Sequence, residues 1–92
     1  MNRVLVISYD LVNPGQNYER LLALIKSSYS SWARLGGSAY LIFTDVSVVD
    51  VRDHLAEALD TNDKLFVGVA PPPSAWRGLP DEVSKWIHAN QK

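Results

Sequence analysis

Three short runs in which every residue is apolar constrain the fold of this chain more than any other feature. They are residues 4–7 (VLVI), 41–43 (LIF) and 65–67 (LFV). Val, Ile and Phe are typical of strands, and a strand with one face in water alternates apolar and polar side chains. The absence of alternation predicts inner strands whose two faces are both shielded from water.

Helical spacing and turn residues place the remaining elements. Apolar residues recur at helical spacing over 17–28, after a breaker at 13–17, and Gly36-Gly37 is a strong hairpin signal. Ser47 is placed to cap a second helix, and the prolines at 71–73 stop the last strand. The predicted order is strand, helix, strand, strand, helix, strand and helix, over residues 3–10, 17–28, 32–35, 39–44, 48–59, 64–70 and from 80 onward.

This order consists of two split βαβ units followed by an extra C-terminal helix. It predicts one α+β domain over residues 1–92, a ferredoxin-like βαββαβ sandwich with its strands in the order four, one, three, two. In such a two-layer fold the helices cover one face of the sheet only. The last helix or a second copy of the chain must then cover the other face, and we expect a homodimer.

Composition and charge narrow the classes of function. The chain has no cysteine, which excludes disulfides and thiolate metal sites. It has no apolar stretch of membrane-spanning length and no signal-peptide pattern, so we expect a cytoplasmic protein without a membrane partner. The net charge is −1, the pI is about 6.0 and the nine basic residues are scattered. Since a domain that holds a duplex carries a clear basic excess, nucleic-acid binding is expected to be local, weak or dependent on an oligomer.

Two aspartates follow predicted strands. Asp10 ends the first strand, and Asp45 follows the third. We expect these strands to be parallel neighbours, so that both carboxylates lie at one edge of the sheet and hold Mg²⁺, which activates water for phosphodiester cleavage. The alternative is structural. Asp10 then accepts backbone hydrogen bonds from the loop at residues 11–15, Leu11-Val12-Asn13-Pro14-Gly15, and Asp45 stabilises the N-terminus of the next helix.

Several basic and aromatic residues are candidates for contact with nucleic acid. Trp76 and Arg77 follow the prolines as a pair that is able to stack a base or dock a partner. Arg34 lies beside Trp32 on a short edge strand, and Arg20 lies on the first helix. In the alternative interpretation the two Trp side chains pack against the core, and Arg20 only solvates a helix face.

The stretch VLVISYDLVNPGQNYERLLALIKS, residues 4–27, resembles the start of the small CRISPR-associated adaptation-nuclease family. The shared features are a first strand that ends in Tyr-Asp and a helix with an early Arg. Small stand-alone bacterial relatives are more similar still, with YDL, a Pro-Gly turn, an aromatic near Trp32, Thr-Asp after the third strand and an aspartate before KLFV. The family also includes the virulence-associated protein D endoribonuclease toxins, and the resemblance covers roughly residues 3–70.

The resemblance implies a ferredoxin-like homodimer in which Asp10 occupies the metal-ligating position near the twofold axis. Two features depart from the family pattern. The loop at 11–18 lacks the charged, Arg-bearing character usual there, and the tail after Pro73 predicts a helix where the family often adds a strand that reaches onto the partner. Many family members bind nucleic acid without cutting it, so the resemblance alone does not establish an enzyme.

Three functions remain open at this point. The first is a Mg²⁺-dependent endoribonuclease or endodeoxyribonuclease that acts through Asp10 of both subunits. The second is a non-catalytic dimeric module that binds nucleic acid or protein. The third is a small dimeric domain that shares only the fold, because one fold hosts many functions. The acidic pI favours the two non-catalytic hypotheses.

Overall fold

The computed structural model describes residues 1–12 and 14–91. In this part of the chain the elements are β1 (Arg3–Asp10), α1 (Pro14–Ser28), β2 (Trp32–Gly36), β3 (Ala39–Thr44), α2 (Val48–Ala56), β4 (Lys64–Val69) and α3 (Asp81–Asn90). The predicted order is confirmed. α1 begins at Pro14 rather than at residue 17, because proline has the φ of a helix and its missing N–H is not needed in the first turn.

The four strands of the described residues form one sheet in the order β2-β3-β1-β4, and each neighbouring pair is antiparallel. The predicted strand order is confirmed. The predicted direction of β3 relative to β1 is wrong, because the two are antiparallel neighbours. The crossover through α1 makes β1 parallel to β2, and the tight turn at Gly37-Ser38, one residue after the predicted Gly36-Gly37 position, then reverses the chain into β3.

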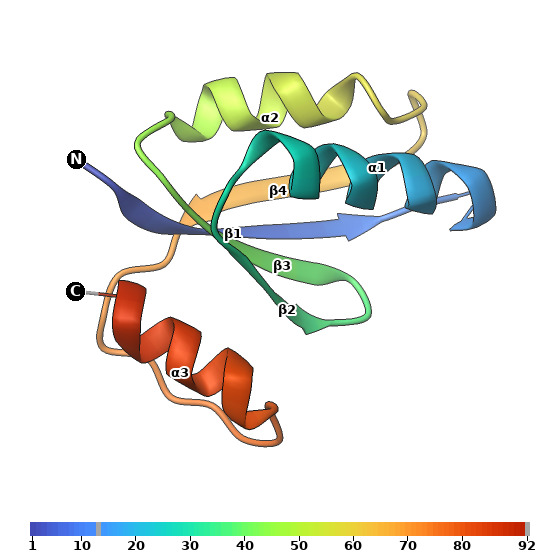
Figure 1. The fold of residues 1–92 in the computed structure, drawn as a ribbon. Coiled ribbons are helices and arrows are strands. Elements are labelled where there is room, and N and C mark those ends of the chain that lie inside the picture. Colours follow the sequence, from blue (N-terminus) through green and yellow to red (C-terminus); the bar gives the residue numbers. More distant parts are fainter. Residues whose placement is uncertain (13, 92) are drawn as a thin grey trace.

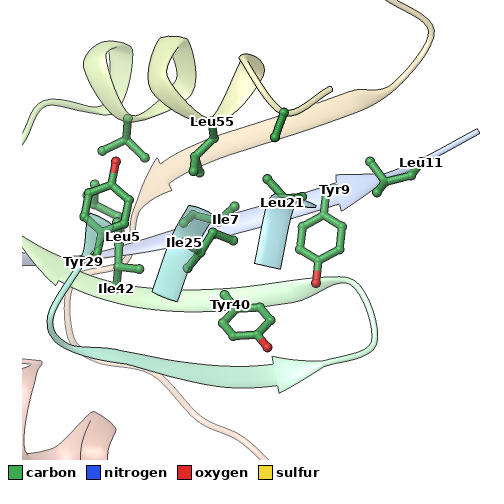
Figure 2. Packing of buried hydrophobic residues seen from close by; sticks show 12 residues of the cluster. Leu5, Ile7, Tyr9, Leu11, Leu21, Ile25, Tyr29, Tyr40, Ile42 and Leu55 are labelled. Atoms are coloured by element: carbon green, nitrogen blue, oxygen red, sulfur yellow. The ribbon is translucent and has the colours of Figure 1, made fainter. Parts of the chain in front are cut away.

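α1 and α2 cover one face of the sheet, and the first hydrophobic core lies beneath them (Figure 1). Ile7 of β1 and Ile42 of β3 point into this core, where they meet Leu21 and Ile25 of α1 and Leu55 of α2 (Figure 2). All five side chains are fully buried. Their removal from water is the main stabilising contribution on this side of the sheet.

α3 lies on the opposite face of the sheet and forms a second, smaller core (Figure 1). Val4 of β1 and Leu41 of β3 are buried there with Val83 and Ile87 of α3. Alternate residues of the inner strands therefore enter opposite cores, which explains why their apolar runs do not alternate with polar residues. The last helix is one of the two predicted coverings, so the apolar runs do not by themselves require a second copy of the chain.

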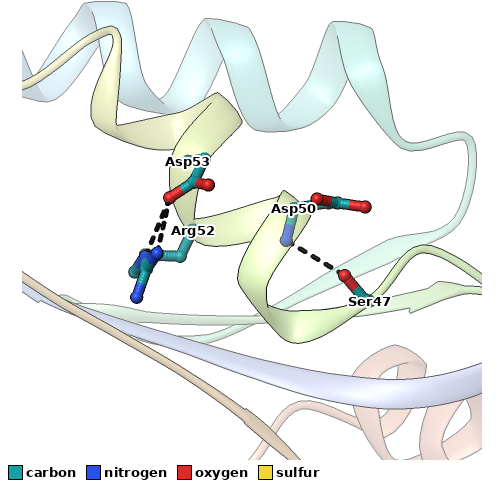
Figure 3. A network of polar contacts seen from close by, with 4 residues as sticks. All are labelled: Ser47, Asp50, Arg52 and Asp53. Carbon is teal, nitrogen blue, oxygen red and sulfur yellow. Dashed lines mark hydrogen bonds and ion pairs between the residues drawn. The ribbon is translucent and has the colours of Figure 1, made fainter.

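The N-terminus of α2 is capped as predicted. The Ser47 hydroxyl accepts a hydrogen bond from the Asp50 backbone N–H at 3.1 Å (Figure 3). One turn further along, the Arg52 guanidinium and the Asp53 carboxylate form an exposed ion pair at 2.8 Å. An exposed pair of this kind contributes little to stability.

The described residues form a small mixed α+β structure with three helices. None of these helices is both long and apolar enough to cross a membrane.

Candidate functional site

Asp10 is the last residue of β1, and the sheet register places it opposite Lys64, the first residue of β4. Because side chains alternate along a strand, Asp10 shares a sheet face with Val4 and Ser8. This is the face that α3 covers, but α3 lies away from the Asp10 end of β1 (Figure 1). Asp10 is exposed, and among the residues that the structure describes its carboxylate has no hydrogen bond or ion pair.

A shallow hollow of about 180 Å³ surrounds this carboxylate, and its lining comes from the adjoining ends of β1 and β4. The lining residues are Ser8, Tyr9, Asp10, Lys64, Leu65 and Phe66. The hollow therefore combines one carboxylate, one ammonium group and one hydroxyl with an apolar wall, and the Phe66 side chain is 63% exposed. A carboxylate beside an ammonium group is able to hold a cation and a phosphate together.

Asp63, and not Asp10, binds the backbone of the loop that follows β1. One oxygen of the Asp63 carboxylate accepts a hydrogen bond from the Val12 N–H at 2.8 Å, and the other accepts one from the Asp60 N–H at 2.9 Å. The structural alternative assigned the hydrogen bonds of this loop to Asp10, but the bond from the Val12 N–H goes to Asp63 instead. The part of that alternative that concerns Asn13 falls outside the described residues.

Asp45 lies at the opposite end of the sheet from Asp10. Thr44, the residue before Asp45, pairs with Arg3 at the start of β1, whereas Asp10 ends the same strand. At about 3.4 Å per residue, the two ends of β1 are about 24 Å apart. The prediction that Asp10 and Asp45 lie near each other in one chain is therefore wrong, and the cause is the antiparallel direction of β3.

The carboxylates of one chain do not form a complete metal site. Among the described residues no group of three or more His, Asp or Glu side chains could hold an ion. Mg²⁺ is commonly held by one or two carboxylates, with water and substrate phosphate in the remaining positions. Asp10 fits the role of one protein ligand of this kind, and Asp45 does not fit as a second ligand from the same chain.

Tyr9 lines the same hollow but points toward the first core. Burial raises the pKa of its phenol, and the neighbouring Tyr18 raises that pKa further. The two rings meet edge to face, with centroids 5.3 Å apart. Tyr9 therefore stays protonated at neutral pH and is not a candidate general base.

Trp76 packs on the second core. Its indole N–H donates to the Ser84 hydroxyl at 3.2 Å, and the centroids of its ring and the His88 ring are 5.1 Å apart. This is the alternative in which Trp76 folds back after the prolines, although the side chain keeps some exposure. Arg77, the next residue, is exposed in the loop before α3.

The other two basic candidates lie on separate elements. Arg34 is exposed on β2, and its side chain donates to the Gly36 carbonyl at 3.2 Å. Arg20 is exposed on α1. The hollow around Asp10 is lined by none of Arg20, Arg34, Trp76 and Arg77. The structure therefore does not gather the predicted nucleic-acid-binding residues around the predicted catalytic aspartate.

Lys64 and Phe66 were not predicted from the sequence to belong to a site, and Asp63 was noted there only as the aspartate before KLFV. All three lie at or beside the start of β4, in a stretch interpreted there as a turn and a buried strand. The exposure of Phe66 follows from its partner across β1 and β4, the exposed Ser8, but that partner is given by the sheet register and not by the sequence. An apolar residue opposite an exposed serine is expected to face solvent.

Comparison with known proteins supports the fold alone. No family model matches the chain, and no curated protein matches it. Among solved structures, a hypothetical protein from Thermus thermophilus, TT1823, superposes with a TM-score of 0.70 at 21% sequence identity. The match covers 86% of this chain and 94% of that chain. The two proteins share an α+β architecture over most of their length.

Proposed function

We propose that the protein is a ferredoxin-like homodimer that binds nucleic acid at the Asp10 end of its sheet and cleaves phosphodiester bonds there with Mg²⁺. The observation that supports this proposal is the Asp10 carboxylate, which is exposed and unpaired among the described residues. If Asp10 had only a structural role, its carboxylate would accept hydrogen bonds from the backbone N–H groups of the neighbouring loop. Here Asp63 binds the Val12 N–H instead.

The residues around Asp10 have separate roles in this proposal. Asp10 holds the cation, and Lys64, directly across from it, contacts a phosphate oxygen of the substrate. When bound, Mg²⁺ neutralises phosphate charge and supplies an activated water for hydrolysis. The hollow is shallow, so the substrate is a strand that lies across the surface rather than a small molecule that is enclosed.

The homodimer in this proposal follows from the family resemblance and from the number of carboxylates. One chain contributes Asp10 alone to the hollow. Asp10 of the partner subunit is the second carboxylate, as the resemblance implies for a pair of aspartates beside the twofold axis. A cation shared in this way also relieves the repulsion between the two negative charges.

The test is cleavage of labelled RNA and labelled DNA by purified protein in Mg²⁺, in Mn²⁺ and in EDTA. We expect cleavage with the metals, none in EDTA, and a loss of about 100-fold or more in Asp10→Ala. The matched control is Asp45→Ala, an exposed aspartate at the other end of β1, which should cleave like the wild type. Equal cleavage by the Asp10→Ala variant would show a contaminating nuclease and remove the proposal.

A second candidate function is a non-catalytic dimeric module that binds another protein. The observation in its favour is charge, because the net charge is −1 and Lys64 is the single basic residue that lines the hollow around Asp10. Gel shifts with single-stranded and double-stranded RNA and DNA at increasing salt distinguish the two. Phosphate contacts weaken as salt rises, and Lys64→Gln should lower the salt dependence by about one phosphate contact. Absence of binding to all four nucleic acids at low salt favours the protein-binding module.

A further inference from the structure

β4 is an edge strand whose single charged residue, Lys64, lies at its first position, so the rest of its edge is apolar. It is the last strand in the sheet order, so one side pairs with β1 and no strand of the described chain pairs with the other. Phe66 is 63% exposed on one face of β4, and Val69 is 46% exposed on the other. Natural edges are normally short, bulged or charged, because open apolar edges pair with other chains. The other edge strand, β2, is protected by a register shift near Gly36 and by Arg34.

The register shows which backbone groups of β4 face outward. The Ala70 N–H donates to the Val4 carbonyl at 2.9 Å, so residues 64, 66, 68 and 70 direct their N–H and C=O groups toward β1. In an antiparallel ladder the intervening residues direct theirs away from the partner strand. Leu65, Val67 and Val69 therefore present a row of unpaired donors and acceptors at the free edge.

This row is symmetric about Val67. We propose that two copies of the chain pair antiparallel through β4, with the twofold axis at Val67, and form a continuous eight-stranded sheet. In this register Val67 faces Val67 of the partner subunit, and Leu65 faces Val69 of the partner subunit. All three outward-facing residues of each copy then enter narrow hydrogen-bonded pairs, so no backbone group of the row remains unpaired.

The side chains fit the same register. Phe66 comes opposite Gly68 of the partner subunit, so the two Phe66 rings are diagonal neighbours across the twofold axis, where they cover each other. Within one chain the Phe66 ring already lies over Gly68, since a Cβ added there would be 2.9 Å from a ring carbon. On the other face, Val69 gains contact with Leu65 of the partner subunit. Both exposed apolar side chains of β4 are thereby covered.

Charge is compatible with the pairing. Lys64 carries the positive charge of β4, and the register places it opposite Ala70 of the partner subunit. The two Lys64 ammonium groups thus lie at opposite ends of the paired strands and do not repel each other. A parallel arrangement would instead bring the two lysines side by side.

The expected affinity is modest. Two paired strands of six residues bury less than the roughly 800 Å² per partner that is typical of stable complexes. We therefore expect a dissociation constant in the micromolar range. This interface differs from the one through Asp10 in the proposed function, because Asp10 lies on β1 opposite Lys64 and the register places the two Asp10 residues at opposite ends of the paired strands.

Sedimentation equilibrium across micromolar concentrations tests the interface. The mass of the wild type is expected to rise with concentration from 10.3 kDa to at least twice that value, and further where the interface through Asp10 also forms. Val69→Lys places a charge on the edge and should weaken association by about tenfold or more. The matched control is Val49→Lys, because Val49 is a similarly exposed valine (51%) on α2, and it should associate like the wild type. A wild type that stays at 10.3 kDa, or equal weakening by both variants, overturns the proposal.

Amide hydrogen exchange on the wild type provides a measurement that needs no variant. Dimerisation should slow exchange at Leu65, Val67 and Val69 together, since these outward-facing amides become bonded. A dimer formed through Asp10 would leave them unprotected, and such a result overturns the edge pairing even if the mass doubles. The nuclease assay with Val69→Lys distinguishes the two proposals. This variant loses edge pairing but keeps Asp10 and Lys64, so it should cleave like the wild type.

Discussion

The Tyr9 hydroxyl is buried, and among the described residues it has no hydrogen-bond partner. Its neighbour Tyr18 donates instead to the Gly37 carbonyl, in the turn between β2 and β3. An unsatisfied buried hydroxyl destabilises the folded state by about 1–3 kcal/mol relative to a satisfied one. We therefore expect phenylalanine to be more stable than tyrosine at position 9.

Tyr9→Phe should stabilise the protein by about 1 kcal/mol at neutral pH, because it removes the unsatisfied hydroxyl and keeps the buried ring. Urea unfolding measures the change. Tyr18→Phe, the control, should destabilise, since it removes a hydrogen bond that is made. A Tyr9→Phe variant less stable than the wild type would show that the hydroxyl has a partner.

The stability difference between Tyr9→Phe and the wild type should also depend on pH. Burial raises the pKa of Tyr9 in the folded state above the value of about 10 expected in the unfolded chain. Above about pH 10 the unfolded state loses the Tyr9 proton before the folded state does. The free energy of unfolding of the wild type is therefore unaffected by this ionisation below about pH 10 and falls as the pH rises above that value. The advantage of Tyr9→Phe over the wild type should therefore be larger near pH 11 than at pH 7.

At the scale of single residues, the sequence predicts which side chains have chemistry but not which are free to use it. Asp10 and Asp63 both adjoin strands beside turns. Only the structure shows that Asp63 binds the Val12 N–H and that Asp10 stays open among the described residues. The choice depends on where the loop after β1 meets the turn before β4, residues 51 positions apart in sequence. Local patterns contain no information about such a contact.

At the scale of elements, most of the architecture could be predicted. The order of elements, the strand order and the need to cover both faces of the sheet followed from periodicity and apolar runs. The direction of β3 was also available, since a crossover followed by a hairpin makes β3 antiparallel to β1. The path of residues 71–80 was not, because Trp76 settles on the second core through contacts with Ser84 and His88 on α3, which are remote from the prolines in sequence.

The attachment of α3 to the sheet can be tested at Ile87, which is 4% exposed in the second core. Ile87→Ala should destabilise the protein by about 2–4 kcal/mol, because it removes buried apolar surface and leaves a cavity. Lys85→Ala on the exposed side of the same helix should cost less than about 0.5 kcal/mol. Similar small losses for both variants would mean that α3 contributes little to covering the second face.

At the scale of the whole molecule, the two cores are joined by the strands that they share. Val4 faces one core and Leu5 faces the other, and the same holds for Leu41 and Ile42 on β3. If the strands of one core unfold, the other core loses the sheet residues against which its helices pack. The chain should therefore unfold as one cooperative unit, as small single domains usually do.

This cooperativity has a direct measurement. In a Trp32→Phe background, Trp76 and Trp86 report on the α3 layer by fluorescence, whereas far-UV circular dichroism reports on all the helices and strands together. The two probes should give the same urea midpoint, and Ile87→Ala should shift both midpoints equally. If fluorescence changes first, α3 separates from the sheet before the rest unfolds. The second face of the sheet would then be free to bind a partner, and a dimer through that face would again be expected.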